Sequence, residues 1–194
     1  MGVMDRFSLT GRTAVVTGST RGLGRAFARA LAEAGASIVV VGRDADAASE
    51  VEAELRQVGA HSHSVLADLT RRPDVERVLV EAVETFGRVD VLVNNAGTCI
   101  HKPALEVTDD EWREVMGTNV DALWVASQVF GAHMVERGGG SIVNIGSMSA
   151  SIVNRPQWQP AYNASKAAVT TSPAASRRSG RHSACASMPS RRAT

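Results

Sequence analysis

The feature that most limits the fold of this chain is a set of five short segments, most of them continuously apolar, without the alternation of a half-exposed strand. They lie at residues 13–17, 37–41, 63–66 (the weakest), 89–93 and 141–145. Helix-forming sequence separates them, including residues 26–34, residues 75–86, and a long stretch from about 110 to 137. Strands that are apolar on both faces require a parallel sheet with helices on each side. The sequence therefore predicts an α/β fold, a doubly wound parallel sheet, with ligands at the carboxyl ends of the strands.

A glycine-rich turn follows the first of these segments and opens the first helix. Glycines let the backbone approach a pyrophosphate, and the free N–H groups of the helix start bind its charge. The spacing is Gly-x-x-x-Gly-x-Gly rather than Gly-x-Gly-x-x-Gly, so a tight turn without a ligand remains an alternative for this motif alone. The candidate cofactor residues here are Gly18, Thr20, Arg21, Gly22, Leu23 and Gly24.

Two further candidates follow later strands. Asp68 and Leu69 come after the third strand, where the carboxylate can accept a hydrogen bond from an adenine amino group; a helix cap is the alternative. Asn95, Ala96 and Gly97 follow the fourth strand, where small residues let the backbone and a cofactor meet; a plain turn is the alternative.

The end of the second strand bears on the choice of cofactor. An enzyme that prefers NAD usually has an acid here to bind the ribose 2′-hydroxyl, but this chain has Gly42 followed by Arg43. A guanidinium can pair with a 2′-phosphate, and Arg21 can add a second positive charge. The sequence favours NADP over NAD, with a solvated loop arginine as the alternative for Arg43.

Tyr162 and Lys166 lie four positions apart, which places both side chains on one face of a helix. The unperturbed pKa of a phenol is near ~10, and a neighbouring ammonium lowers it by stabilising the phenolate. This pair therefore predicts an acid/base site. Ser147 follows the fifth strand at the same edge of the sheet, with Ser149 as its competitor and a backbone-bonded hydroxyl as its alternative role.

Together these motifs resemble the short-chain dehydrogenase/reductase family, from about residue 7 to about residue 171. The resemblance implies a nicotinamide-dependent Rossmann enzyme that uses no metal in its chemical step. It implies that Tyr162 exchanges the hydroxyl proton, that Lys166 lowers the pKa of this tyrosine and binds the nicotinamide ribose, and that Ser147 holds the substrate oxygen. Asn119 resembles the asparagine that holds a water relay to Lys166; a helix-surface role is its alternative.

The resemblance implies hydride transfer between the nicotinamide and an alcohol or carbonyl substrate. The segment 145–157 resembles the polyol and sugar dehydrogenase branch, in which the serine also precedes the tyrosine by 15 positions. Asn154, Gln157 and Gln159 can supply polar partners to a polyol, although a loop that faces water explains them almost as well. The alternatives are a 3-oxoacyl thioester or steroid reductase of the same family, and an inactive truncated remnant or nucleotide-binding module without turnover.

Residues 172–194 differ from the rest of the chain. They contain five arginines, no acid, and no valine, leucine, isoleucine or aromatic residue. Such a segment cannot bury a strand. We therefore expect residues 1–171 to form the NAD(P)-binding domain with the catalytic residues, and residues 172–194 to be a disordered tail outside the family. The family normally continues with further strands and a substrate lid, so a truncation or shifted reading frame is expected, with a sheet incomplete at its C-terminal end and weak or no turnover.

Charge and composition limit the partners. Residues 1–171 hold 16 basic residues against 20 acids, which argues against nucleic acid as a partner. No apolar run approaches the roughly 20 residues of a membrane span, so a cytoplasmic location without membrane contact is expected. The histidines and the two cysteines show no metal-ligand spacing. The resemblance implies a homo-oligomer for the full-length family fold, and this chain is not expected to form one.

Overall fold

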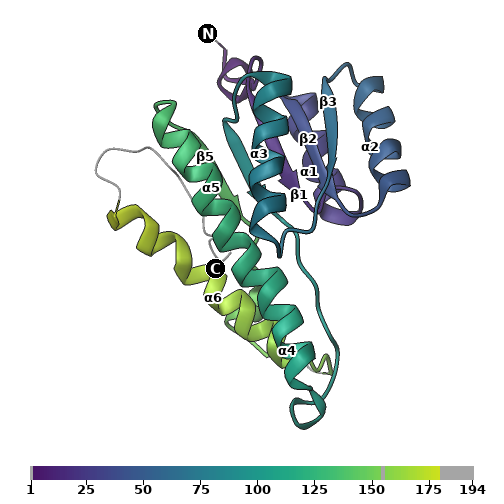
Figure 1. Ribbon diagram of the computed structural model, residues 1–194, viewed down its shortest axis with the longest axis vertical. Helices are drawn as coiled ribbons and strands as arrows, with labels where there is room; N and C mark the ends of the chain where they lie inside the picture. The colour runs from purple at the N-terminus through teal and green to yellow at the C-terminus, as the bar shows by residue number, and fades with distance from the viewer. Residues whose placement is uncertain (1, 154–155, 180–194) are drawn as a thin grey trace.

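A five-stranded parallel sheet forms the centre of the protein in the computed structural model, which describes residues 2–153 and 156–179 (Figure 1). Its strands are β1 (Thr13–Thr17), β2 (Ser37–Gly42), β3 (Ser62–Leu66), β4 (Val91–Asn94) and β5 (Ser141–Asn144), in the order β3-β2-β1-β4-β5. Every neighbouring pair is parallel, with Val15 opposite Val39 and Leu92. Since the chain leaves β1 toward β2 and later crosses to β4 on its other side, the carboxyl ends of β1 and β4 form a switch point suited to ligands.

Helices cover both faces of this sheet, as predicted from strands that are apolar on both sides. On one face α1 (Gly22–Glu33) and α2 (Ala45–Gln57) pack on alternate strand residues such as Val16 and Val40. On the other face α3 (Arg72–Phe86) and α5 (Ala122–Glu136) pack on the remaining ones, such as Val15 and Val39. Figure 1 shows α3 and α5 side by side across that second face. The predicted doubly wound α/β fold is confirmed.

The long helix expected at about 110–137 is interrupted. It consists of α4 (Asp109–Met116), a π-helical segment η3 (Gly117–Asp121), and α5. The π turn is closed by the Ala122 N–H, which donates to the Gly117 carbonyl five residues earlier. Thr108 and Glu111 form a capping box at the start of α4. The π segment contains Asn119, so the break in the regular helix lies at a candidate site residue.

The last described helix is α6 (Pro160–Ser179), which packs against α4, η3 and a short 3₁₀ turn η4 (Met148–Ala150). Two further 3₁₀ turns are η1 (Met4–Phe7) and η2 (Ala104–Glu106). Because α6 continues to Ser179, residues 172–179 are helical rather than disordered as expected from their composition. The remainder of the expected tail, residues 180–194, lies outside the described residues. In the part of the chain that is described, no helix is long and apolar enough to cross a bilayer.

At the amino end of the sheet, Asp90 ties three strands together. Its carboxylate accepts hydrogen bonds from the Thr13 N–H (3.0 Å) and from the Arg12 guanidinium (2.8 Å), and Arg88 lies 2.6 Å away. Its backbone carbonyl accepts from the Ser141 N–H at the start of β5. Burial alone would raise the pKa of Asp90, but the Thr13 N–H and the two arginines outweigh it and lower the pKa. This anchor lies opposite the edge where the candidate site residues gather.

Candidate active site

The glycine turn between β1 and α1 touches the loop after β4. Gly18 has a φ of +63°, and a Cβ at Gly18 would lie 2.9 Å from the Ala96 Cα. A Cβ at Gly24 would lie 2.5 Å from the Asn95 Nδ2 and even closer to the Gly18 carbonyl oxygen. Neither position has room for a side chain, so the sequence needs glycine at both. The turn therefore brings two loop backbones into direct contact at the switch point.

Polar side chains hold the two loops together. The Asn95 amide donates to the Thr17 carbonyl (2.9 Å) and the Gly18 carbonyl (3.1 Å). The Thr17 hydroxyl accepts from the N–H groups of Asn95 (2.9 Å) and Ala96 (3.0 Å). The amide hydrogens of Asn95 thus point into the turn. Asn95 shapes the candidate cofactor site rather than offering its amide N–H groups to a ligand.

The remaining turn residues leave open space beside the start of α1. A Cβ at Gly22 would meet no atom within 4 Å, so the start of α1 has open space beside its backbone. Arg21, directly before α1, and Leu23 in its first turn are exposed, while Thr20 is buried. Free N–H groups at a helix start beside open space fit a pyrophosphate, which is the group that a nicotinamide dinucleotide would place there.

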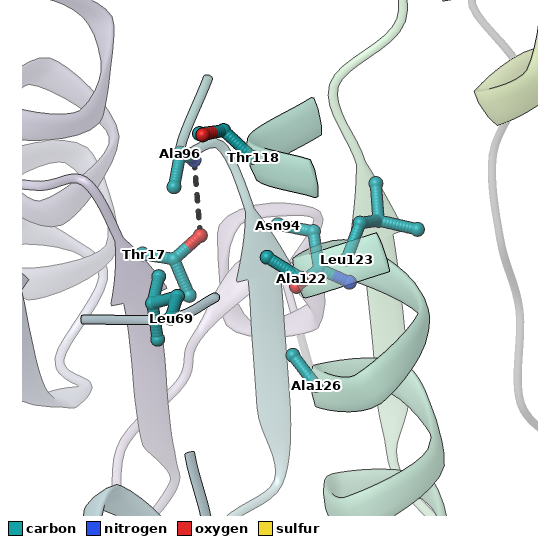
Figure 2. A pocket seen from close by; sticks show the side chains of 8 residues that line it. All are labelled: Thr17, Leu69, Asn94, Ala96, Thr118, Ala122, Leu123 and Ala126. Carbon is teal, nitrogen blue, oxygen red and sulfur yellow. Dashed lines mark hydrogen bonds between the residues drawn. The ribbon is translucent and has the colours of Figure 1, made fainter. Parts of the chain in front are cut away.

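A small hollow lies beside this turn, between the carboxyl ends of β1 and β4 and the start of α5 (Figure 2). Leu69, Ala96 and Thr118 line it together with Thr17, Asn94, Ala122, Leu123 and Ala126. Figure 2 shows the Thr17 hydroxyl pointing toward the Ala96 N–H at the hollow. Two of the lining residues, Leu69 and Ala96, are candidates for the cofactor site.

Asp68 lies half-buried after β3 in a turn of its own. Its Oδ1 accepts hydrogen bonds from the Thr70 hydroxyl (2.7 Å) and the Thr70 N–H (3.1 Å), and these bonds lower the pKa of Asp68. The carboxylate therefore stabilises a local turn rather than capping α3, whose N-cap residue is Arg71. Arg43 lies close enough to contribute electrostatically to this lowering. The ends of β2 and β3 thus bring Arg43 and Asp68 near one another.

Gly42 has a packing reason for its lack of a side chain. A Cβ at this position would collide with the Thr20 side chain of the glycine turn. No acidic side chain fits there while Thr20 keeps its place. Neither Arg43 nor Arg21 forms an ion pair with another residue of the described ranges, so both exposed guanidinium groups are available to a ligand.

Tyr162 and Lys166 lie on α6, with the Lys166 Nζ 5.7 Å from the centre of the Tyr162 ring. Lys166 is only 5% exposed, and its Nζ donates to the Ile145 carbonyl (2.8 Å) directly after β5. Burial lowers the pKa of Lys166, so its ammonium gives up a proton more readily than an exposed lysine does. The pair expected from spacing is therefore formed, and the strand that leads to Ser147 holds its lysine in place.

Ser147 is the N-cap residue of the turn η4. Its Oγ accepts a hydrogen bond from the Ser149 N–H (3.1 Å). Ser149 itself is 5% exposed, and its hydroxyl accepts from the Gln159 amide (3.1 Å). Of the two serines, Ser149 is thus enclosed by the protein while Ser147 is half-buried. The greater exposure of Ser147 fits the prediction that Ser147, rather than Ser149, contacts the substrate.

Asn119 is 1% exposed and bonded on every side. Its amide nitrogen donates to the Thr98 carbonyl (2.9 Å) and the Ser165 hydroxyl (2.9 Å), and its Oδ1 accepts from the Thr98 N–H (2.8 Å). The helix-surface alternative is wrong. Since both amide hydrogens are used, the side chain has none to give a water, and its place in a relay to Lys166 remains a prediction. Gly97 lies beside it, since a Cβ there would stand 3.2 Å from the Asn119 Oδ1.

Two supporting residues escape sequence reasoning, and a third is placed differently from the substrate contact predicted for it. The Ser19 hydroxyl donates to the Val16 carbonyl (2.7 Å) and accepts from the Val41 N–H (3.0 Å), which joins the glycine turn to β2. Ser165 is fully buried and links Asn119 to the Tyr162 carbonyl (2.8 Å). Gln159, expected to face a substrate, is 6% exposed and bonded within the protein. Polar residues close to a motif are the only sequence signal for such roles.

Two further predicted polar contacts of a substrate stay predictions. Asn154 lies outside the described residues, and Gln157 is exposed. Within the ranges that are described, no group of three or more potential metal ligands occurs.

Comparison with known proteins agrees with this arrangement. The family model for short chain dehydrogenases matches residues 12–179. Galactitol 2-dehydrogenase (L-tagatose-forming) from Cereibacter sphaeroides is 44% identical over 163 residues, which make up 84% of this chain and 63% of that protein.

Two solved structures are similar to a comparable degree. A gluconate 5-dehydrogenase from Burkholderia cenocepacia J2315 in complex with NADP and tartrate has a TM-score of 0.81 at 35% identity, over 88% of this chain and 66% of that one. A 7α-hydroxysteroid dehydrogenase complexed with NADH and 7-oxo glycochenodeoxycholic acid has a TM-score of 0.82 at 35% identity, with the same two coverages. The chain spans just under two thirds of the length of these relatives. Since the family model covers most of its residues, from β1 through α6, this chain belongs to the short-chain dehydrogenase family.

Proposed function

We propose that this protein transfers a hydride between a nicotinamide cofactor and an alcohol or carbonyl substrate. The observation that carries the proposal is the buried Lys166 beside the Tyr162 ring, held by the Ile145 carbonyl two residues before Ser147. This contact holds the helix that carries Tyr162 and Lys166 at the carboxyl end of β5, two residues before Ser147. The nicotinamide would supply or accept the hydride, and side chains of the protein would donate or accept the accompanying proton.

Each side chain has a role in that proton transfer. Tyr162 gives its proton to the carbonyl oxygen in reduction and takes it back in oxidation. The Lys166 ammonium stabilises the phenolate that remains. Ser147 donates a hydrogen bond to the substrate oxygen as negative charge develops there. The N–H groups at the start of α1, beside the open space at Gly22, would hold the pyrophosphate, and Leu69, Ala96 and Gly97 would border the nucleotide.

We propose NADP as the preferred cofactor, with NAD as the alternative. Support comes from the exposed guanidinium groups of Arg21 and Arg43, which are free of ion pairs with other described residues, and from Gly42, where an acid would collide with Thr20. A similar gluconate 5-dehydrogenase was solved with NADP, but a similarly related steroid dehydrogenase was solved with NADH. Titration with both reduced cofactors decides between them.

We propose a polyol or sugar as the substrate. The support is the 44% identity to a galactitol 2-dehydrogenase and the similarity to a gluconate 5-dehydrogenase. A steroid is the second candidate, because a 7α-hydroxysteroid dehydrogenase is about as similar in structure. A panel containing galactitol, a pentitol, a hydroxysteroid and a simple secondary alcohol distinguishes them. Polyols are expected to be oxidised fastest, and a tenfold or greater preference for the steroid would contradict the assignment.

The test of the reaction uses the whole chain and a Tyr162→Phe variant. Wild type is expected to reduce the nicotinamide with galactitol, and the variant to do so at least about 100-fold more slowly, since an acid/base group contributes roughly 10²–10⁴-fold. Cofactor affinity should change less than about twofold, because the ring is retained. Equal rates in both proteins would remove Tyr162 from the mechanism. Tight cofactor binding without turnover in wild type would instead favour a nucleotide-binding module.

A further inference from the structure

We propose that Gln159 is a positioning residue that sets the orientation of the Ser147 hydroxyl through Ser149. The catalytic meaning of this inference rests on the proposed oxidoreductase function, whereas the hydrogen-bonded chain itself can be tested without turnover.

Gln159 joins three segments, one of which, the loop that contains Cys99, is 60 residues away in the sequence. Its amide nitrogen donates to the Ser149 hydroxyl (3.1 Å) in the turn after β5, and its Oε1 accepts from the Cys99 thiol (3.4 Å) in the loop after β4. Its backbone carbonyl accepts from the Asn163 N–H (3.0 Å) in the first turn of α6, which carries Tyr162. One residue thus connects the serine turn, the loop beyond the cofactor candidates, and the tyrosine helix.

The Gln159 amide is closed to water and has partners at both ends. Gln159 is 6% exposed and Ser149 5% exposed, so if the bond between them broke, the Gln159 amide N–H would lose its acceptor in a buried place. The Cys99 thiol fixes which way the amide faces, because a thiol donor selects the carbonyl oxygen and turns the NH₂ group toward Ser149. Burial raises the pKa of Cys99, which keeps the thiol protonated and able to donate. The His101 Nε2 lies 3.6 Å from the sulfur and can donate to it at the same time.

This chain of bonds ends at Ser147. With the Ser149 side chain held by Gln159, its backbone N–H donates to the Ser147 Oγ (3.1 Å). A hydroxyl has one hydrogen to donate and two lone pairs that accept. A fixed donor on one lone pair limits the rotation of the Ser147 hydroxyl and leaves its hydrogen for an acceptor, which the proposed reaction supplies as the substrate oxygen. Gln159 is therefore bound into the protein and acts on the substrate only through Ser147.

The test is a double-mutant cycle between Gln159→Met and Ser147→Ala. Methionine is similar in length to glutamine but cannot form either amide bond. In the protein that retains Ser147, we expect Gln159→Met to lower kcat about tenfold. This loss is smaller than the roughly 10²–10³-fold loss that follows deletion of an oxyanion donor. The KM for the cofactor should change less than about twofold. In the Ser147→Ala background the same change should cost less than about twofold. An equal loss in both backgrounds would overturn the inference, because a general structural defect does not depend on Ser147.

Ser149→Ala provides a second route to the same bond and does not depend on the folding of the methionine variant. It should reproduce the kcat loss of Gln159→Met, and combining the two should add little. Gln57→Met is the matched control, since Gln57 is exposed at the end of α2 and remote from the site. Additive losses from the two site variants, or a comparable loss in the control, would contradict the proposed chain.

Hydrogen exchange distinguishes failure of this inference from failure of the proposed function. If wild type shows no turnover, the proposed function fails for this chain, and exchange of the segment 147–151 alone decides the inference. Gln159→Met should speed exchange of this segment at least about threefold, because the Ser149 side chain loses the Gln159 bond that holds its backbone N–H at the Ser147 Oγ. The Gln57→Met control should exchange like wild type. Unchanged exchange in Gln159→Met would overturn the role of Gln159.

Discussion

Replacing Gly24 by alanine tests the contact between the glycine turn and the loop after β4. The new Cβ would lie 2.5 Å from the Asn95 Nδ2 and closer still to the Gly18 carbonyl oxygen, a separation that side chains do not adopt. The loops must separate, which strains packing by about 1–3 kcal/mol and weakens an Asn95 bond worth about 0.5–1.5 kcal/mol. Alanine offsets up to about 1 kcal/mol of this loss in stability, because it is a better helix former than glycine. We expect a net loss of about 1–3 kcal/mol in the free energy of unfolding.

Urea denaturation followed by far-UV circular dichroism measures this loss, and titration with NADPH measures its effect on the site. Cofactor affinity should fall at least about tenfold, because a displaced turn no longer presents the N–H groups at the start of α1. Gly117→Ala is the control: a Cβ there meets no atom within 4 Å, and its φ is −58°. This control should be as stable as wild type or up to about 1 kcal/mol more stable. If Gly24→Ala proves as stable as Gly117→Ala, the close approach of the two loops is refuted.

Three further predictions concern other parts of the fold and site. Asp90→Asn should lower the free energy of unfolding by about 1–3 kcal/mol at pH 7. Folding lowers the pKa of Asp90, so its contribution to stability is present above about pH 4 and is lost as the pH falls through the folded-state pKa. Chemical denaturation should therefore show the free energies of unfolding of wild type and variant converging in acid. Arg43→Asp should weaken NADPH binding at least about tenfold while NADH binding falls less, as measured by titration, and an unchanged preference would exclude this arginine from cofactor choice. Asn119→Ala should lower the free energy of unfolding by about 2–4 kcal/mol, because the half-buried Thr98 backbone groups and the buried Ser165 hydroxyl lose their bonds to the amide; an unchanged melting temperature would contradict this.

The sheet and its order of helices could be predicted because they depend on local composition. Val15 and Val39 lie in runs that are apolar at every position, and only a strand covered on both faces needs such a run. The Tyr162–Lys166 pair was also predictable, since helical spacing alone brings two such residues together. Asp68 was harder: its turn with Thr70 is local, yet a cap and a turn use the same residue types.

The features that escaped prediction depend on partners distant in the sequence. The π segment interrupts an otherwise regular helical pattern, and its Asn119 is bound to Thr98 and to Ser165, 21 and 46 residues away. Gln159 resembled a surface amide because its acceptor contact with Cys99 spans 60 residues. Periodicity reports which face of an element is apolar, but it does not report which polar group is enclosed by another loop.

Transfer of deuterium from a labelled alcohol tests the central proposal most directly. Galactitol labelled with deuterium at the carbon that is oxidised would be mixed with oxidised NADP and an excess of the whole chain over the cofactor, so that a single slow turnover is sufficient for detection. Mass spectrometry of the nucleotide should then show reduced nicotinamide carrying one deuterium, and Tyr162→Phe should form it at least about 100-fold more slowly. Reduced nucleotide without deuterium, or none at all from protein that demonstrably binds NADP, would contradict hydride transfer by this chain.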